Sequence, residues 1–378
     1  MLDKHGLYIP EQVNVAIVGA GPAGLGVARV LRDLGIPDVW VLERGVIGQN
    51  MLRWPRQTRL LTPSFPGNVF GITDLNAISY DSSPGWALKR EHPTGEEYAR
   101  YLDQAALAFN LNVQCDIDVL GLEPEGDWLS LKTDRGTIRA EFVIWACGQF
   151  GAPSDGGIIG SEHARHYASV RRWRDIEGDE VFVIGGYESG IDAAVSLSQE
   201  GKRVTVFDFD SPWDDDDKDP SRALSPFTHQ RLREEKRHGR ITLEGGEEIM
   251  ALKKEAEGIR LYGSNGRSWL SQHAPVLATG FASGTGPVAE WFDYADGLPR
   301  LSLEDESTAL PGLFLVGPEV SHNGHLFCFI YKFRQRFAVV ARAIAERMDV
   351  DTEPLQLYRE NNMYLDDLAC CDADKCLC

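Results

Sequence analysis

The sequence predicts an α/β protein with two similar units, each built around a parallel sheet. Residues 13–26 (VNVAIVGAGPAGLG) form an apolar run that ends in a Gly-x-Gly-x-x-Gly turn and continues into a helix-like segment. Residues 181–190 (VFVIGGYESG) repeat this theme. A chain of 378 residues is also too long for one ordinary core. Because an internal repeat outweighs a single motif, we expect two Rossmann-like dinucleotide-binding domains.

The first unit has the context that a dinucleotide motif requires. Residues 15–18 are continuously apolar, as in a buried parallel strand. Gly19 permits the tight turn, Gly21 lets the backbone approach a pyrophosphate, and Gly24 lets the helix pack closely on the strand. The helix N-terminus then offers N–H groups and a positive dipole end to phosphates. The second strand ends in Glu43, near the spacing of roughly 20 residues expected for a carboxylate that binds a ribose 2′-hydroxyl.

Composition and charge narrow the classes of partner. Hydrophobic residues make up 43% of the chain and charged residues 25%, as in a globular protein. No run approaches the roughly 18 apolar residues of a membrane span, and the N-terminus lacks an apolar signal core, so we expect no membrane partner and a cytoplasmic location. The net charge of −19 argues against nucleic acid, because the basic stretch at 171–174 is short.

The middle of the chain predicts further elements. Residues 45–95 are rich in turn residues and aromatics, and we interpret them as a folded excursion over a ligand. Thr94 and Glu97 form a capping-box pattern that opens a helix to about residue 110. The strands expected next run over 113–114, 119–123, 128–133, 137–140 and 142–147.

The second unit continues beyond its glycine turn in the same way. We expect a helix over 191–199, a strand over 204–207, a helix over 228–238, a small meander over 241–269 and a strand over 274–279. The acidic run over 208–219 lacks the ligand spacing and the turn glycine of a calcium loop, so we interpret it as a solvated loop. The last expected elements are a strand over 313–316 and a helix over 327–348.

These motifs resemble those of flavoproteins with two dinucleotide-binding domains, of the thioredoxin-reductase-like and flavin-monooxygenase-like class. The matching segments are residues 19–24 with Glu43, 185–190, 146–148, 278–280 and 311–317. The resemblance covers residues 13–348, and within the class the chain looks most like the bacillithiol-disulfide reductases. It implies a second domain inserted in the first, each with a small β-meander. The expected division is 1–170 for the first part of the FAD-binding domain, 171–273 for an NAD(P)-binding-like domain, 274–348 for the second FAD-binding part, and 349–378 for an acidic cysteine-rich tail.

The resemblance implies FAD in the first domain. The glycines would lie on the pyrophosphate and Glu43 on the adenosine ribose. The expected FAD-binding residues are Gly19, Gly21, Pro22, Ala23, Gly24, Glu43, Arg44, Asn50, Met51, Trp54, Gly148, Gly317, His325 and Leu326. Pro318 stands where the family often has Asp, so the usual carboxylate contact to the ribityl chain is missing at that position.

The resemblance implies a nicotinamide cofactor in the second domain, either NADH or NADPH. The expected residues are Gly185, Gly186, Tyr187, Glu188, Ser189, Asp208 and Gly280. A carboxylate at Asp208 favours a 2′-hydroxyl over a 2′-phosphate, so NADH is the better candidate. Tyr187 replaces the second fingerprint glycine, and a remnant domain without nucleotide is the alternative.

The cysteines divide into two groups. Cys115, Cys147 and Cys328 are dispersed among apolar residues, where we expect them to pack as small hydrophobes. The other four crowd the last nine residues, and we take them as the catalytic thiols: Cys370, Cys371, Cys376 and Cys378. A mobile dithiol shuttle would pass electrons to a small-molecule or protein disulfide through thiolate exchange. An irregular metal site and an inert tail are the alternatives; we expect no metal elsewhere.

Two other functions stay open. A flavin monooxygenase would use NAD(P)H and O₂, and residues 160–167 resemble its Gly-x-x-x-His linker fingerprint, although His166 is off register. An FAD-binding redox- or metal-sensing protein with a degenerate nicotinamide site would also fit the cysteine-rich tail. A homodimer is one arrangement that the sequence allows.

Overall fold

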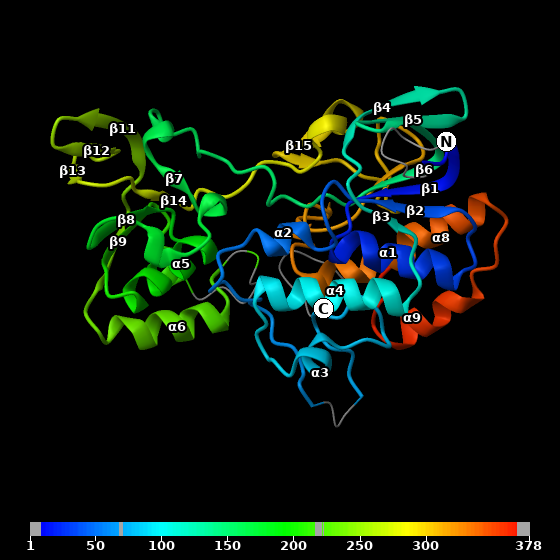
Figure 1. Cartoon of the computed structure of the whole chain (residues 1–378), viewed down its shortest axis with the longest axis horizontal. Coiled ribbons are helices and arrows are strands. Elements are labelled where there is room, and N and C mark those ends of the chain that lie inside the picture. The colour runs from blue at the N-terminus through cyan, green and yellow to red at the C-terminus, as the bar shows by residue number, and fades with distance from the viewer. Residues whose placement is uncertain (1–8, 68–70, 216–220, 222, 369–378) are drawn as a thin grey trace. The chain divides into compact units, whose positions relative to one another are not determined.

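The computed structural model describes residues 9–67, 71–215, 221 and 223–368 (Figure 1). The chain splits into two compact units. Unit 1 takes the described residues of Met1–Leu52, Pro63–Gln149 and Ser283–Cys378, and unit 2 takes those of Arg53–Thr62 and Phe150–Ala282. Unit 2 is therefore longer than the expected range of 171–273 at both ends and includes a short segment from before the first meander. The predicted α/β class with two Rossmann-like units is confirmed.

Unit 1 contains a parallel sheet in the order β3-β2-β1-β6-β17. Its strands are β1 (Gln12–Val18), β2 (Val39–Leu42), β3 (Val113–Gln114), β6 (Gly136–Trp145) and β17 (Leu313–Leu315). β6 is one continuous strand, so the expectation of two strands at 137–140 and 142–147 is wrong. The first half of β6 pairs with β5 and its end pairs with β17, while β1 pairs with β6 from Arg139 to Trp145 and so bridges both parts.

Two antiparallel strands and two helices complete the first part of unit 1. The meander strands are β4 (Val119–Glu125) and β5 (Trp128–Thr133), and the longer helices are α1 (Pro22–Asp33) and α4 (Gly95–Ala108). The predicted capping box at the start of α4 is present, because the Thr94 hydroxyl accepts from the Glu97 N–H while the Glu97 carboxylate accepts from the Thr94 N–H. The excursion between β2 and α4 contains α2 (Gln49–Leu52) and α3 (Pro84–Leu88).

The C-terminal part of unit 1 is helical but interrupted. The expected single helix over 327–348 consists of α7 (Ile330–Phe333), the 3₁₀ turn η6 (Arg334–Arg336) and α8 (Phe337–Arg347). The break coincides with Arg336, which is fully buried and binds the Asp305 carboxylate through two nitrogens at 2.9 Å. α8 lies beside α1, where Gly26 leaves room for the Phe337 ring (Figure 1).

The chain after α8 stays folded on unit 1 as far as Leu368. It forms η7 (Glu353–Leu355) and α9 (Gln356–Glu360), and it buries Tyr358 and Met363. The Tyr358 hydroxyl donates to Asp33 at 2.6 Å. The described part of the expected cysteine-rich tail, residues 349–368, therefore belongs to the packed fold of unit 1.

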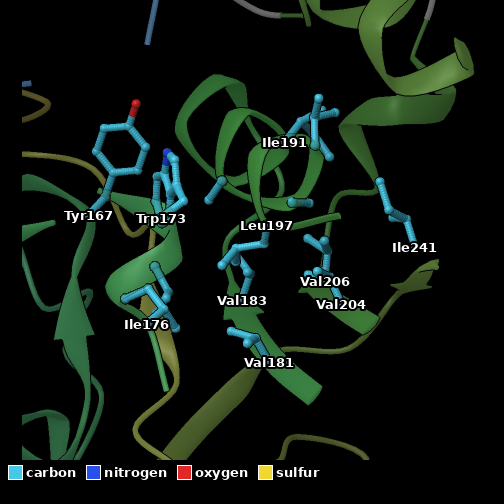
Figure 2. Packing of buried hydrophobic residues seen from close by; sticks show 14 of the residues in the cluster. Tyr167, Trp173, Ile176, Val181, Val183, Ile191, Leu197, Val204, Val206 and Ile241 are labelled. Carbon is cyan, nitrogen blue, oxygen red and sulfur yellow. The ribbon is translucent and has the colours of Figure 1, made fainter. Parts of the chain in front are cut away.

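Unit 2 is built on a five-stranded parallel sheet in the order β10-β9-β8-β14-β7. Its strands are β7 (Arg165–His166), β8 (Glu180–Ile184), β9 (Arg203–Asp208), β10 (Ile241–Gly245) and β14 (Val276–Leu277). Its helices are α5 (Glu188–Gln199) and α6 (Pro226–Lys236). Figure 2 shows the core between sheet and helix, where Val183 and Val206 pack against Leu197 of α5.

The meander of unit 2 is shorter than predicted. It consists of β11 (Ile249–Glu255), β12 (Gly258–Gly263) and β13 (Ser268–Ser271), which pair antiparallel. Residues 241–245 were expected in this meander, but they join the parallel sheet because Ile241 registers with Val204 of β9. None of the helices in the described residues is long and apolar enough to cross a bilayer.

Short elements connect these parts. In unit 2 they are η1 (Ser161–His163), η2 (Tyr167–Ser169), η3 (Trp173–Asp175) and η4 (Pro212–Asp214). In unit 1 they are η5 (Gly286–Trp291), β15 (Tyr294–Ala295), β16 (Leu298–Pro299), β18 (Ser321–His322) and β19 (His325–Leu326).

Candidate functional site

The glycine turn of unit 1 joins β1 to α1, and its first and third glycines are required by packing. Gly19 has φ +108, and a Cβ there would lie 2.7 Å from the Ala146 carbonyl oxygen. A Cβ on Gly24 would lie 1.9 Å from the Gly19 carbonyl oxygen. Gly21 is different, because no heavy atom lies within 4 Å of where its Cβ would be. Open space beside Gly21 is what a bound pyrophosphate requires.

The N-terminus of α1 is suited to an anion. Gly21 is its N-cap residue and provides no side-chain cap, and the first turn carries no acidic residue. Pro22 and Ala23, both expected at the cofactor, are the first two residues of the helix. The free N–H groups and the dipole of α1 therefore face the open side of the turn.

Glu43 lies next to the same turn and keeps unused acceptor capacity. It is 9% exposed, and its carboxylate accepts from the Ala20 N–H at 2.8 Å and from the Gly45 N–H at 2.9 Å. A carboxylate offers roughly four lone-pair positions. The remaining two can accept from ribose hydroxyls, as the sequence predicts for this residue.

Other expected FAD residues of unit 1 gather around this turn. The Asn50 amide donates to the Cys147 carbonyl at 3.0 Å, and Gly148, with φ +62, follows directly. Gly317 has φ +117, and a Cβ on it would meet the Ala23 side chain at 3.5 Å. The structure thus brings residues after β2, β6 and β17 to the carboxyl edge of one sheet, where ligands of such sheets bind.

Glu319 is a residue of this cluster that the sequence did not single out. It is 3% exposed, and its Oε2 accepts from the Gly284 N–H at 2.9 Å. A Cβ on Gly284 would lie 1.9 Å from the Gly148 carbonyl oxygen, so Glu319 lies close to Gly148. Its Oε1 is buried and has no hydrogen-bond partner among the described residues. Burial raises the pKa of Glu319, against the Gly284 N–H and the nearby Ser283 hydroxyl.

His325 adds a second unmatched group in the same segment. It lies in β19 beside Leu326, and its buried Nε2 also lacks a partner within the described chain. A buried polar atom without a partner costs free energy unless a ligand or water satisfies it. Three features therefore fit FAD: the open space beside Gly21, the unused acceptor positions of Glu43, and the buried Glu319 Oε1 and His325 Nε2 atoms without partners among the described residues. A buried carboxylate, that of Glu319, lies one residue after Pro318.

Three further expected FAD residues are Arg44, Met51 and Trp54. Arg44 is exposed, and Met51 lies in α2 and is half-buried. Trp54 belongs to unit 2, where its carbonyl accepts from Arg171 at 2.8 Å and its ring lies 6.4 Å from Phe150. Trp54 is therefore not in the unit that holds the other FAD residues.

Unit 2 repeats the architecture of the first turn. Gly185 has φ +99, and a Cβ there would lie 2.4 Å from the Ala278 carbonyl oxygen. A Cβ on Gly190 would lie 1.9 Å from the Gly185 carbonyl oxygen. Tyr187 takes the place of the middle glycine, is the N-cap of α5, and is 42% exposed. Ser189 follows in the first turn of α5 and is half-buried.

The acidic residues of unit 2 are more fully engaged than Glu43. Asp208 accepts from the N–H groups of Gly186 at 2.6 Å, Asp210 at 2.9 Å and Ser211 at 3.1 Å. Burial raises the pKa of Asp208 despite these bonds. Glu188 accepts from the Ser225 N–H and the Thr228 hydroxyl of α6, and burial raises its pKa.

The linker histidine and Gly280 interact with each other. The His166 Nε2–H donates to the Gly280 carbonyl at 3.1 Å, and its Nδ1 accepts from the Ala168 N–H at 3.1 Å. Both ring nitrogens are thus matched, and burial lowers the pKa of His166. This pattern is that of a structural histidine.

Two of the described cysteines, Cys115 and Cys147, are poor thiolates. Burial raises the pKa of Cys147 to about 12 and also raises that of Cys115. Since thiolate is the reactive form, neither is an activated thiol. The four expected catalytic thiols, Cys370, Cys371, Cys376 and Cys378, lie outside the described residues.

Comparisons with known proteins identify the family of this chain. Residues 16–317 match the family model described as pyridine nucleotide-disulphide oxidoreductase. The chain is 30% identical over 216 residues, 54% of its length and 39% of the relative's, to a Baeyer-Villiger monooxygenase from Streptomyces coelicolor. It is 23% identical over 348 residues, 89% of its length and 98% of the relative's, to the bacilliredoxin reductase Bdr of Bacillus subtilis.

A solved structure supports the fold over most of the chain. The bacillithiol disulfide reductase Bdr (YpdA) from Staphylococcus aureus superposes with a TM-score of 0.73 at 20% identity, covering 89% of this chain and 99% of that one. The chain spans about half the length of the monooxygenases it matches first. The chain belongs to the pyridine nucleotide-disulphide oxidoreductase family, and the predicted resemblance is confirmed.

Proposed function

We propose that this pyridine nucleotide-disulphide oxidoreductase passes electrons from NADH, through FAD held in unit 1, to a thiol–disulfide system. Membership of the family supports a flavin-dependent oxidoreductase. The main support for FAD binding is the open space beside Gly21. Next to it, Glu43 keeps acceptor positions that its two hydrogen bonds to the chain leave free. FAD, when bound, supplies two-electron redox chemistry.

The residues of unit 1 would bind and orient the cofactor. The N–H groups at the start of α1 would bind the pyrophosphate, and Glu43 would accept from the adenosine ribose. Glu319 and His325 would meet polar atoms of the cofactor with Oε1 and Nε2, which have no hydrogen-bond partner among the described residues. The apolar ends of β1 and β6 would keep water from the site.

The charge around unit 2 supports NADH over NADPH. Asp208 ends β9, and Asp208, Asp210 and Asp215 together raise the pKa of the Tyr187 hydroxyl, after burial as the main cause. A negative field of this kind disfavours a 2′-phosphate more than a 2′-hydroxyl. A tenfold or greater ratio of flavin reduction rates in favour of NADH is the expected result, and a preference for NADPH contradicts this part of the proposal.

The acceptor would be a disulfide of a small molecule or a protein. NADH and one proton supply the two electrons and two protons that convert one disulfide into two thiols, with NAD⁺ as the other product. Because Cys115 and Cys147 are poor thiolates, the terminal cysteines would be the route. The similarity to a bacilliredoxin reductase supports a thiol system.

Deletion of residues 369–378 tests the thiol route. The deletion begins directly after Leu368, which is buried, so the packed part of unit 1 stays whole. We expect the truncated protein to keep FAD and its reduction by NADH but to lose disulfide reductase activity. Titration of free thiols after anaerobic NADH reduction should show a gain of about two per chain in the full protein and none in the truncated one.

A monooxygenase is the second candidate, supported by 30% identity to a Baeyer-Villiger monooxygenase. It predicts NADH-driven oxygen uptake that a small organic substrate stimulates. Full turnover of the truncated protein with such a substrate would favour the monooxygenase and contradict the thiol route.

A further inference from the structure

The indole of Trp213 lies across the carboxyl end of the unit 2 sheet. Its Cζ3 atom lies 2.5 Å from where a Cβ on Gly186 would be, and its Cζ2 atom lies 3.5 Å from where a Cβ on Gly245 would be. Gly186 follows β8 and Gly245 ends β10. Since β9 lies between these two strands, the ring spans the end of β9, which is Asp208.

This place is where the adenosine half of a nucleotide would lie. In such sheets the ligand binds outside the carboxyl ends of the strands, and the acidic residue that ends the second strand binds the adenosine ribose. Trp213 is also packed on the hydrophobic core of unit 2, so the ring is anchored there. Glycine at both positions has a reason independent of any ligand, because a Cβ on Gly186 would collide with the indole and a Cβ on Gly245 would lie 2.2 Å from the Ser211 hydroxyl.

Unit 1 shows the same turn without such a ring. There the chain after the second strand returns to the turn through glycines, and the Gly48 N–H donates to the Ala20 carbonyl at 3.0 Å. The Glu43 carboxylate uses two acceptor positions, whereas Asp208 uses three. Unit 2 thus has less space and fewer free acceptors at the adenosine side.

We propose that Trp213 is a specificity-determining residue of unit 2, because its indole occupies the adenosine side of the nucleotide site. A nucleotide with an adenosine half must displace the ring, and a ligand without that half need not. This inference rests on the proposed function in taking unit 2 as the nucleotide-binding unit. It adds that the wild-type site binds the adenosine half of a nucleotide more weakly than the same site would without the indole.

The test measures binding of two probes to the FAD-loaded full chain by calorimetry. ADP-ribose carries the adenosine half and no reducing power, and reduced nicotinamide mononucleotide lacks that half. W213A should bind ADP-ribose at least about tenfold more tightly than wild type, and W213F should fall between them. The affinity for reduced nicotinamide mononucleotide should stay within about twofold in all three. W86F is the matched control, since Trp86 is 64% exposed in unit 1.

A second readout follows the ring itself. Saturating ADP-ribose should change the tryptophan fluorescence of wild type and W86F but not of W213F, and this comparison needs no W213A protein. Unchanged or weaker ADP-ribose binding by W213A, or no binding by either protein, would overturn the inference; weaker binding would identify the ring as a stacking platform. Flavin reduction by NADH tests the proposed function separately from the role of Trp213. NADH can still reduce the flavin if Trp213 has no effect on ADP-ribose binding, and Trp213 can weaken ADP-ribose binding even if NADH does not reduce the flavin.

Discussion

The two glycine turns of this protein share their packing and differ in what they leave open. In both, a first glycine with positive φ abuts a neighbouring carbonyl, and a third glycine lies on the carbonyl of the first. Beside Gly21 there is empty space, whereas in unit 2 Tyr187 replaces this glycine and the Trp213 ring lies against the preceding residue, Gly186. The comparison teaches that the Gly-x-x-x-x-Gly spacing is a requirement of strand–helix packing. The ligand is indicated by the residues between those glycines.

The largest expected effects come from the glycines that both units share. G24A and G190A each place a Cβ 1.9 Å from a backbone carbonyl oxygen, so strand and helix must separate. We expect each to lower the free energy of unfolding of its unit by about 3 kcal/mol, the upper end for overpacking. Urea denaturation followed by circular dichroism measures this. G121A is the control, because no atom lies near its Cβ position, and equal stability of G24A and G121A would contradict the packing account.

The middle position of the turn should affect the ligand and not the fold. Gly21 has φ −87 and no neighbour within 4 Å of a Cβ, so alanine fits the apoprotein. We expect purified G21A to lose most of its FAD by crowding the pyrophosphate, while the melting temperature of its apo form stays within about 2 °C of wild type. The 450 nm to 280 nm absorbance ratio gives the FAD content. Full FAD content in G21A would show that the open space is not the pyrophosphate site.

Much of this comparison could be predicted from the sequence. Short-range signals such as apolar runs, glycine spacing and the Thr94–Glu97 capping box predicted most strands and helices. The assignment of residues 241–245 was wrong because a short strand of mixed polarity has the same sequence pattern in a meander as at the edge of a parallel sheet. The roles of Glu319 and Trp213 could not be predicted, because they depend on long-range approaches to Gly284 and to Gly186.

Glu319 and Asp208 differ in their hydrogen bonding: one carboxylate oxygen of Glu319 has no partner among the described residues, whereas both oxygens of Asp208 accept hydrogen bonds. E319Q keeps an acceptor for the Gly284 N–H and should keep FAD. E319A leaves that partly buried N–H without its carboxylate partner, which costs up to about 3 kcal/mol, and should lower FAD content. Retention of full FAD content by E319A would remove Glu319 from the site.

The pH dependence of the same residue has a definite sign. Burial raises the pKa of Glu319 in the folded chain, so its contribution to stability is present below the unfolded pKa of about 4.3 and is lost as pH rises through the folded value. Apo E319Q should therefore melt higher than apo wild type at pH 7.5, and the difference should shrink toward pH 4. A difference that grows toward pH 4 would contradict the direction of this shift.

The smallest expected effect concerns the helix N-termini. The first turn of α1 has no acidic residue, whereas that of α5 has Glu188. Removing this charge in E188Q should favour a phosphate at α5 by about 0.3–1 kcal/mol, a two- to fivefold gain in ADP-ribose affinity by calorimetry. E200Q at the far end of α5 is the control. A loss of affinity in E188Q would show that Glu188 supports nucleotide binding.

Anaerobic stopped-flow mixing tests most directly whether unit 2 delivers electrons to a flavin in unit 1. The FAD-loaded protein is mixed with NADH or with NADPH, and the 450 nm flavin band is followed over time. The account predicts that NADH bleaches the band at least about ten times faster than NADPH, and that W213A is reduced at a lower NADH concentration than wild type. A flavin band that neither nucleotide bleaches would contradict the account and would identify unit 2 as a remnant domain.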